Sequence, residues 1–164
     1  MEIGLFRMDE ITSALILSAR QEMEVGNYSA AFRILWPLVQ NDCAEALFLY
    51  STFSVAGSES DADFEQRSLA MLGRAAELGY APAIYALGVC YESGDLVAAA
   101  DPERAGKLFE SAAATAHPNA MYRHGLNLIS GSNGIPRNAS MGLRLVQEAA
   151  QNGVEDAVEY LKDH

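Results

Sequence analysis

A repeat of 37 residues runs through most of this chain and constrains its fold more than any other feature. One column of the repeat is alanine in four successive copies and another is glycine in three: Ala46, Ala83, Ala120 and Ala157, then Gly57, Gly94 and Gly131. Such a period is typical of solenoids, in which stacked helical pairs bury the apolar faces of their neighbours. The sequence therefore predicts an all-α solenoid of antiparallel helix pairs.

Other columns of the repeat are sorted by side-chain size. One column is large and apolar and another is small: Leu35, Leu72, Phe109 and Val146, against Ala31, Ser68, Ala105 and Gly142. Small columns let helix backbones approach closely, and large columns fill the space between the helices. This sorting indicates a continuous packed core.

Signals for helix starts place the elements within the repeat. Asp101 is a good N-cap, Pro102 suits the first helical position, and Pro118 can open the partner helix. The period then predicts helices over residues 8–24, 28–41, 44–56, 65–78, 82–93, 102–115, 118–130, 139–152 and 155–162. We expect one helical-repeat domain over residues 1–164, with an atypical N-terminal helix in 1–27, repeat units over 28–164 and a truncated capping helix in 155–164.

Two consecutive units resemble a known family. The matching residues are Ala83, Leu87, Gly88, Tyr91, Gly94, Val97, Asp101, Ala105, Phe109, Ala112 and Ala113, and then Ala120, Gly125, Gly131, Gly134, Ile135, Asn138, Gly142, Val146, Ala149 and Ala150. They are similar to the Sel1-like repeat, a relative of the tetratricopeptide repeat. The resemblance extends over about residues 28–164. It implies a right-handed superhelix that binds protein as a scaffold, adaptor or inhibitor, and it implies no chemistry.

The charge balance bears on the partner. Eleven basic and 22 acidic residues give a formal charge of −11, which disfavours nucleic acid and anionic membranes and favours a protein with a basic surface. The same charge is also explained by solubility alone. No run reaches the ~18 apolar residues of a membrane span. Acidic residues precede the apolar stretch 11–17, where a signal peptide would be positively charged, so we expect a cytoplasmic protein.

The sequence gives little support for catalysis, a cofactor or a bound metal. Its three histidines, His117, His124 and His164, lack metal-ligand spacing, and we interpret His124 as a packing residue. Cys43 and Cys90 fall in different columns and are expected to be free thiols.

An acidic cluster is expected in the loop after Gly57. Its members are Glu59, Asp61, Asp63 and Glu65. They lack the glycine and the distal glutamate of an EF-hand calcium loop. A solvated loop and a contact for a basic partner remain the two interpretations.

Candidate binding residues come from the first helix of each pair, which lines the concave face of the tetratricopeptide repeats that the chain resembles. Phe48, Tyr85 and Tyr122 recur every 37 residues and either pack between repeats or grip an extended peptide. The full candidate set is Glu45, Phe48, Thr52, Val55, Tyr85, Val89, Glu92, Tyr122, Leu126, Ile129, Asp156 and Glu159.

These observations predict a noncatalytic module for protein–protein interaction. The most specific hypothesis is a bacterial immunity or inhibitor protein that occludes a toxin or enzyme with a basic surface. One alternative is a scaffold or adaptor that binds a peptide segment of a signalling or secretion partner. Another is a small-ligand-binding protein or enzyme. The oligomeric state stays open.

Overall fold

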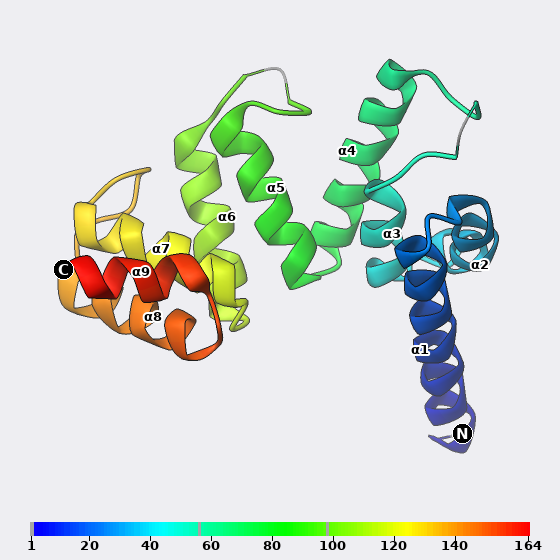
Figure 1. Ribbon diagram of the computed structural model, residues 1–164, viewed down its shortest axis with the longest axis horizontal. Helices are drawn as coiled ribbons and strands as arrows, with labels where there is room; N and C mark the ends of the chain where they lie inside the picture. The colour runs from blue at the N-terminus through cyan, green and yellow to red at the C-terminus, as the bar shows by residue number, and fades with distance from the viewer. Residues whose placement is uncertain (1, 56, 98) are drawn as a thin grey trace. The chain divides into compact units, whose positions relative to one another are not determined.

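The computed structural model describes residues 2–55, 57–97 and 99–164, with side chains from residue 9 onward. Within these ranges the regular elements are all helices (Figure 1). Contacts within the chain divide it into two compact units, Met1–Tyr80 and Ala81–His164. We call them the N-terminal unit and the C-terminal unit.

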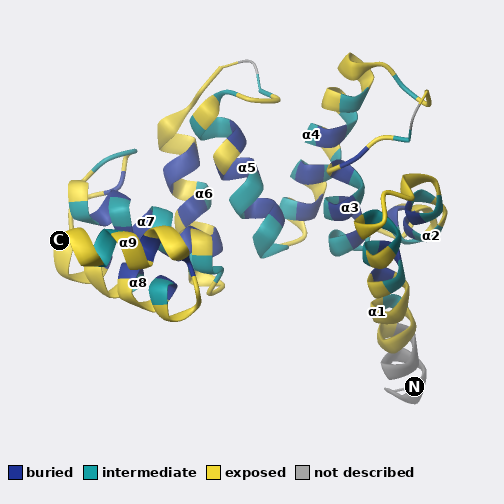
Figure 2. Cartoon of the chain, in the orientation of Figure 1, coloured by how far each residue is buried: buried dark blue, intermediate teal, exposed yellow. Residues whose placement is uncertain are grey.

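The described part of the N-terminal unit contains four helices, and each packs on the next along the chain. They are α1 (Glu2–Glu24), α2 (Tyr28–Gln40), α3 (Ala44–Ser51) and α4 (Asp61–Glu77). α2 buries Ala31, Leu35 and Val39, which lie four residues apart on one side of the helix. The buried residues of α3 and α4 likewise line the inside of the unit (Figure 2).

In the C-terminal unit, residues 81–97 and 99–164 form five helices, and each again packs on the next. They are α5 (Ala81–Ser93), α6 (Pro102–Ala114), α7 (Pro118–Ser130), α8 (Ala139–Gln151) and α9 (Glu155–Asp163). The large columns fill its core, since Phe109 and Val146 have no exposed surface. The small column allows close packing, because a Cβ atom added to Gly142 would lie 2.5 Å from the carbonyl oxygen of Gly125.

Side-chain caps begin α2, α6, α7 and α8 where the sequence predicted. Asp101 accepts a hydrogen bond from the backbone N–H of Arg104 at 3.0 Å, which confirms it as the N-cap of α6. Asn138 does the same for Met141 at the start of α8, at 3.2 Å. These caps satisfy N–H groups that the first turn of a helix leaves unpaired.

Three predicted helix boundaries in the N-terminal unit are wrong. α3 ends at Ser51 instead of continuing to residue 56, which itself lies outside the described residues. The Ser51 hydroxyl donates to the carbonyl of Phe48 at 2.6 Å, and the Thr52 hydroxyl donates to that of Leu49 at 2.7 Å. These side-chain bonds take up carbonyls that another helical turn would have used, so the helix stops there.

The helix that follows begins four residues earlier than predicted, at Asp61. Ser60 is its N-cap: the hydroxyl accepts from the backbone N–H of Asp63 at 3.2 Å and donates to the Asp63 carboxylate at 2.7 Å. Asp61, Asp63 and Glu65 therefore belong to α4, and the prediction that they lie in a loop is wrong. Negative charge in a first turn is stabilised by the helix dipole.

At the N-terminus, α1 begins at Glu2, six residues before the predicted start at residue 8.

Candidate protein-binding face

The first helices of the pairs in the C-terminal unit carry three candidate residues in one column of the repeat. Tyr85 on α5, Tyr122 on α7 and Glu159 on α9 stand 37 residues apart in the sequence. An ion pair between Glu92 of α5 and Arg123 of α7 joins two of these helices. We call the surface that carries Tyr85, Tyr122 and Glu159 the first-helix face.

The aromatic residues of this face take part in packing between repeats. The Tyr85 ring stacks on His117, with centroids 4.8 Å apart, and lies 5.7 Å from the Phe109 ring. Tyr122 packs against the core cluster of Met121, Val146, Ala149, Val154 and Ala157. Both tyrosines are half-buried, so each keeps part of its ring available at the surface.

Exposed carboxylates surround Tyr122. Asp156 and Glu159 on α9 are both exposed. Burial raises the pKa of the Tyr122 hydroxyl, and the negative charges of Asp156 and Glu159 raise it further. A raised pKa keeps the hydroxyl protonated, so Tyr122 can donate a hydrogen bond beside two carboxylates that attract a cation.

The apolar candidates on the same helices differ in exposure. Leu126 and Ile129 of α7 are half-buried and pack against the core cluster around Val146. Val89 of α5 is exposed over 37% of its surface. Leu126 and Ile129 thus contribute to folding, whereas Val89 is accessible to a partner.

Two glutamates of the candidate set, Glu45 and Glu92, already have arginine neighbours. Glu45 accepts a hydrogen bond from Arg20 of α1 at 2.7 Å, and Glu92 pairs with Arg123. Their charges are compensated within the chain. Asp156 and Glu159 have no basic partner within ion-pair distance among the described residues.

The remaining candidates lie in the N-terminal unit. Phe48 packs on Tyr80 with ring centroids 5.5 Å apart. Thr52 is exposed at the C-cap of α3, and Val55 lies in the segment after that helix, so these two residues are not part of the first helix.

An open pocket of about 420 Å³ lies in the C-terminal unit where α7 and α9 begin. Its lining includes His117, Asn119, Glu155 and Asp156. His117 is the N-cap of α7, and its Nδ1 accepts from the backbone N–H of Ala120 at 3.3 Å. The pocket adjoins the first-helix face through Asp156, and its carboxylates suit a basic side chain.

The two cysteines are free thiols, as predicted, and burial raises the pKa of Cys90.

His124 is buried as predicted, and burial lowers its pKa, although Glu110 opposes this shift. Its Nδ1 has no hydrogen-bond partner among the residues that the structure describes. The described residues contain no group of three or more potential metal-ligating side chains, and none of their helices is long and apolar enough to cross a membrane.

A cluster of aromatic residues in the N-terminal unit is absent from the candidate set. It consists of Tyr28, Phe32, Trp36, Tyr50 and Phe53. A signal was present in the sequence, because the column of Trp36 contains Gly73, Glu110 and Gln147 in the later repeats. A comparison of the residues within this column would have singled out Trp36, because the other members are small or polar.

The stacked antiparallel pairs and their 37-residue period define a helical-repeat solenoid protein, and the predicted fold class is confirmed. The model of the Sel1 repeat matches residues 44–80, 81–115 and 118–154, which is more than half of the chain. The chain therefore belongs to the Sel1 repeat family. Proteins with this repeat are generally noncatalytic modules for protein interaction.

Solved structures with the same repeat resemble this chain. A Sel1 repeat protein from Oxalobacter formigenes has a TM-score of 0.69 and 26% identity, over 79% of this chain and 96% of its own. The protein c5321, a protective antigen of uropathogenic Escherichia coli with an SLR fold, has a TM-score of 0.65 and 25% identity, over 77% of this chain and 26% of its own. Helicobacter pylori cysteine rich protein B has a TM-score of 0.55 and 23% identity, over 77% of this chain and 93% of its own, and shows the fold alone.

Proposed function

We propose that this protein is an immunity or inhibitor protein that binds and occludes a toxin or enzyme with a basic surface. The observation that carries the proposal is the exposed pair Asp156 and Glu159 beside Tyr122, on the first-helix face of a Sel1 repeat chain with a charge of −11. Carboxylates next to an aromatic ring suit the lysine and arginine side chains of a partner. The partner's basic surface would be covered directly by this face.

The other candidate residues support the same face in different ways. Val89 supplies exposed apolar area, and Tyr85 presents the uncovered part of its ring. Glu92 contributes through its ion pair with Arg123. A bound partner must either leave this ion pair intact or supply a basic group that replaces Arg123. An interface of this kind has an apolar and aromatic centre with a charged rim.

The first experiment captures the partner from the source organism with the full chain and measures its association rate at two salt concentrations. The attraction reaches ~30 Å at 0.01 M salt but only ~8 Å at 0.15 M, so association should slow as salt rises. An association rate that does not change with salt would contradict the proposal that the partner has a basic surface. A partner from a signalling or secretion system, bound through a peptide segment, favours an adaptor instead.

The decisive variant is Glu159→Arg, with Glu148→Arg as its matched control. Both glutamates are exposed and both substitutions change the net charge equally, but Glu148 lies on the second helix α8. We expect Glu159→Arg to weaken partner binding by about tenfold, a cost of about 1.4 kcal/mol, and Glu148→Arg to have a smaller effect. An equal loss of affinity for the two variants would show that the first-helix face is not part of the interface.

A further inference from the structure

We propose that an aromatic stripe on α2, formed by Tyr28, Phe32 and Trp36, binds an arginine-bearing segment of a partner protein. The inference rests on the proposed function, because it gives the basic partner a contact surface in the N-terminal unit. The three residues stand four apart, so their side chains follow one side of the helix.

The stripe places large, partly exposed rings in columns that contain other kinds of residue in the later repeats. Trp36 is 38% exposed, and the column that it occupies contains Gly73 on α4, Glu110 on α6 and Gln147 on α8. Tyr28 is 42% exposed in a column that otherwise contains Glu65, Pro102 and Ala139. The later repeats fold with small or polar residues at both positions. Large rings there are available for recognition.

Neighbouring rings hold the stripe in place. The Trp36 ring lies 5.4 Å from that of Phe32 and 6.0 Å from that of Tyr50 on α3. Tyr28 stacks at 5.3 Å on Phe53, which is buried. Rings supported in this way lose little conformational freedom when a partner binds, and tryptophan and tyrosine are enriched among residues that dominate binding energy.

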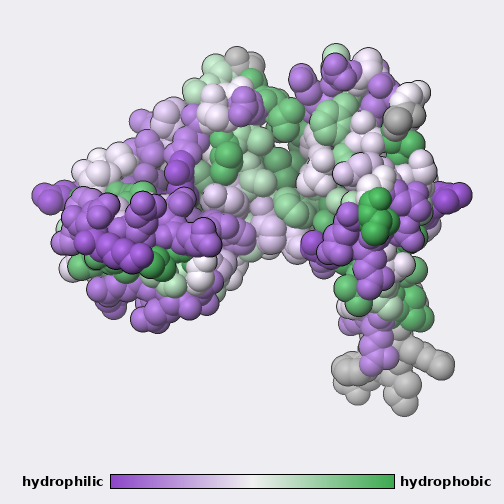
Figure 3. All heavy atoms as spheres, viewed as in Figure 1, coloured by the Kyte–Doolittle hydropathy of each residue, from purple (hydrophilic) through white to green (hydrophobic). Residues whose placement is uncertain are grey.

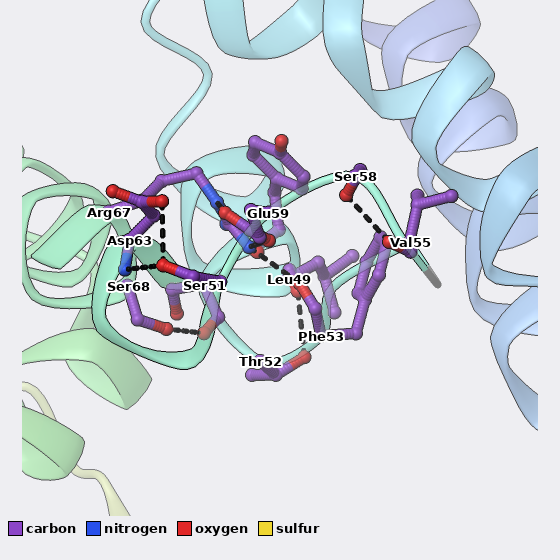
Figure 4. A network of polar contacts seen from close by, with 12 residues as sticks. Leu49, Ser51, Thr52, Phe53, Val55, Ser58, Glu59, Asp63, Arg67 and Ser68 are labelled. Carbon is purple, nitrogen blue, oxygen red and sulfur yellow. Dashed lines mark hydrogen bonds and ion pairs between the residues drawn. The ribbon is translucent and has the colours of Figure 1, made fainter. Parts of the chain in front are cut away.

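One ring of the aromatic cluster, that of Tyr50, already contacts a guanidinium group of the chain, that of Arg67. This guanidinium lies 4.1 Å from the centre of the Tyr50 ring and 5.3 Å from that of Phe64. Glu59 accepts two hydrogen bonds from Arg67, at 2.9 Å and 2.7 Å (Figure 4). Among the described residues no cation lies over the Trp36 ring, although tryptophan is the best ring for such a contact.

The charge of the N-terminal unit attracts a basic segment and disfavours other occupants. Residues 1–80 contain 12 acidic and 5 basic residues, a formal charge of −7. Arg20, Arg67 and Arg74 are each paired with a carboxylate, and Arg33, one turn from Trp36, is exposed. A second copy of this chain or an anionic lipid surface would be repelled. Arg33 opposes a cation locally, so its removal should strengthen binding.

The test uses Trp36 itself as the probe, because it is the one tryptophan in the sequence. The full chain is titrated with a peptide of Arg-Gly-Gly repeats, and then with the corresponding Lys-Gly-Gly peptide. We expect a saturable change in Trp36 fluorescence, with the arginine peptide binding more tightly because guanidinium stacks on aromatic faces. A fluorescence signal that depends on protein concentration without peptide would show self-association and overturn the proposal.

Calorimetry with the same peptide then compares two matched variants. Trp36→Gln introduces the residue that α8 has in this column, and Leu78→Gln removes another exposed apolar residue of the same unit. We expect Trp36→Gln to weaken binding by about 3- to 30-fold and Leu78→Gln to leave it unchanged. Arg33→Glu should strengthen it. Equal affinities of Trp36→Gln and Leu78→Gln for the peptide would overturn the proposal that the stripe binds it.

The two proposals fail separately. If the captured partner binds Trp36→Gln as tightly as the wild type but loses affinity for Glu159→Arg, the stripe is wrong and the proposed function stands. If the peptide requires Trp36 while no captured partner responds to Glu159→Arg, the stripe stands and the proposed first-helix interface is wrong.

Discussion

His117 combines a capping role and a packing role in one side chain. Its Nδ1 accepts the hydrogen bond from Ala120 N–H, and its ring stacks on Tyr85. The Nδ1 atom can accept only while it carries no proton, so this cap requires the neutral imidazole. Burial also lowers the pKa of His117 below its ordinary value of 6.5. The start of α7 is therefore sensitive to acid.

Replacing His117 with asparagine tests this sensitivity. Below pH 6.5 the unfolded chain binds a proton at His117 that the folded chain takes up only at lower pH, so stability is lost as the pH falls. Asparagine caps helices well and does not titrate in this range. Between about pH 7.5 and about pH 5, the melting temperature of the wild type should fall more than that of His117→Asn. His124 and the carboxylates are present in both proteins, so their effects cancel, and parallel curves would contradict the role of His117.

Helices α3 and α4 show what a repeat pattern predicts and what it misses. α7 runs from Pro118 to Ser130 as predicted, since its proline start and its glycine end are local signals. The end of α3 depends on the local Ser51 and Thr52 bonds and also on Arg67, which donates to the carbonyls of Tyr50 at 2.7 Å and Phe53 at 2.9 Å from another helix. A contact across 17 and 14 residues has no signature in local periodicity.

The sequence likewise predicts only part of the candidate face. The period places Tyr85 and Tyr122 in one column, and both residues lie on first helices. The pairing of Glu45 with Arg20 joins residues 25 apart, a separation that the 37-residue period does not contain. Neutralisation of such carboxylates by arginines is visible only once the helices are packed.

At the scale of these elements, Arg67→Lys should lower the free energy of unfolding by about 1–3 kcal/mol. Arg67 and Glu59 are only 16% and 15% exposed, and lysine cannot supply the four hydrogen bonds or the stacked plane. Urea unfolding followed by Trp36 fluorescence measures the difference. Arg74→Lys is the matched control, because Arg74 forms an exposed ion pair with Asp42 and should show no measurable change.

The pH dependence gives a second check on this network. The hydrogen bonds from Arg67 lower the pKa of Glu59 below its ordinary value of 4.5. The contribution of the Glu59 carboxylate is therefore present above pH 4.5 and is lost as the pH falls through the lower folded value. The difference between wild type and Arg67→Lys should shrink in the same range. A constant difference would show that the carbonyl contacts alone stabilise the loop.

At the scale of the whole molecule, hydrophobic and charged surface are unevenly distributed. α1 exposes Ile11, Leu15 and Leu17, and hydrophobic side chains are visible along this helix, whereas hydrophilic ones cover much of α9 (Figure 3). Exposed acidic residues on α9 include Glu155, Asp156, Glu159 and Asp163. The exposed surface of α9 is therefore strongly acidic, whereas that of α1 is partly apolar.

The sequence predicts one domain over residues 1–164, and we propose that the two compact units unfold together. In repeat proteins each unit is stabilised by its neighbour, so a perturbation in one is transmitted to the next. Trp36 reports on the N-terminal unit alone, whereas far-ultraviolet circular dichroism reports on helices throughout the chain. The two signals should give one urea midpoint.

Val146→Ala makes this prediction sharper. Val146 has no exposed surface in the C-terminal unit, and shortening it should cost about 1–3 kcal/mol through lost apolar burial and a residual cavity. In a single cooperative domain the midpoint read from Trp36 falls together with the midpoint read from circular dichroism, although the substitution lies in the other unit. If the Trp36 midpoint stays unchanged while the dichroism curve shifts or splits, the units unfold independently and the chain contains two domains.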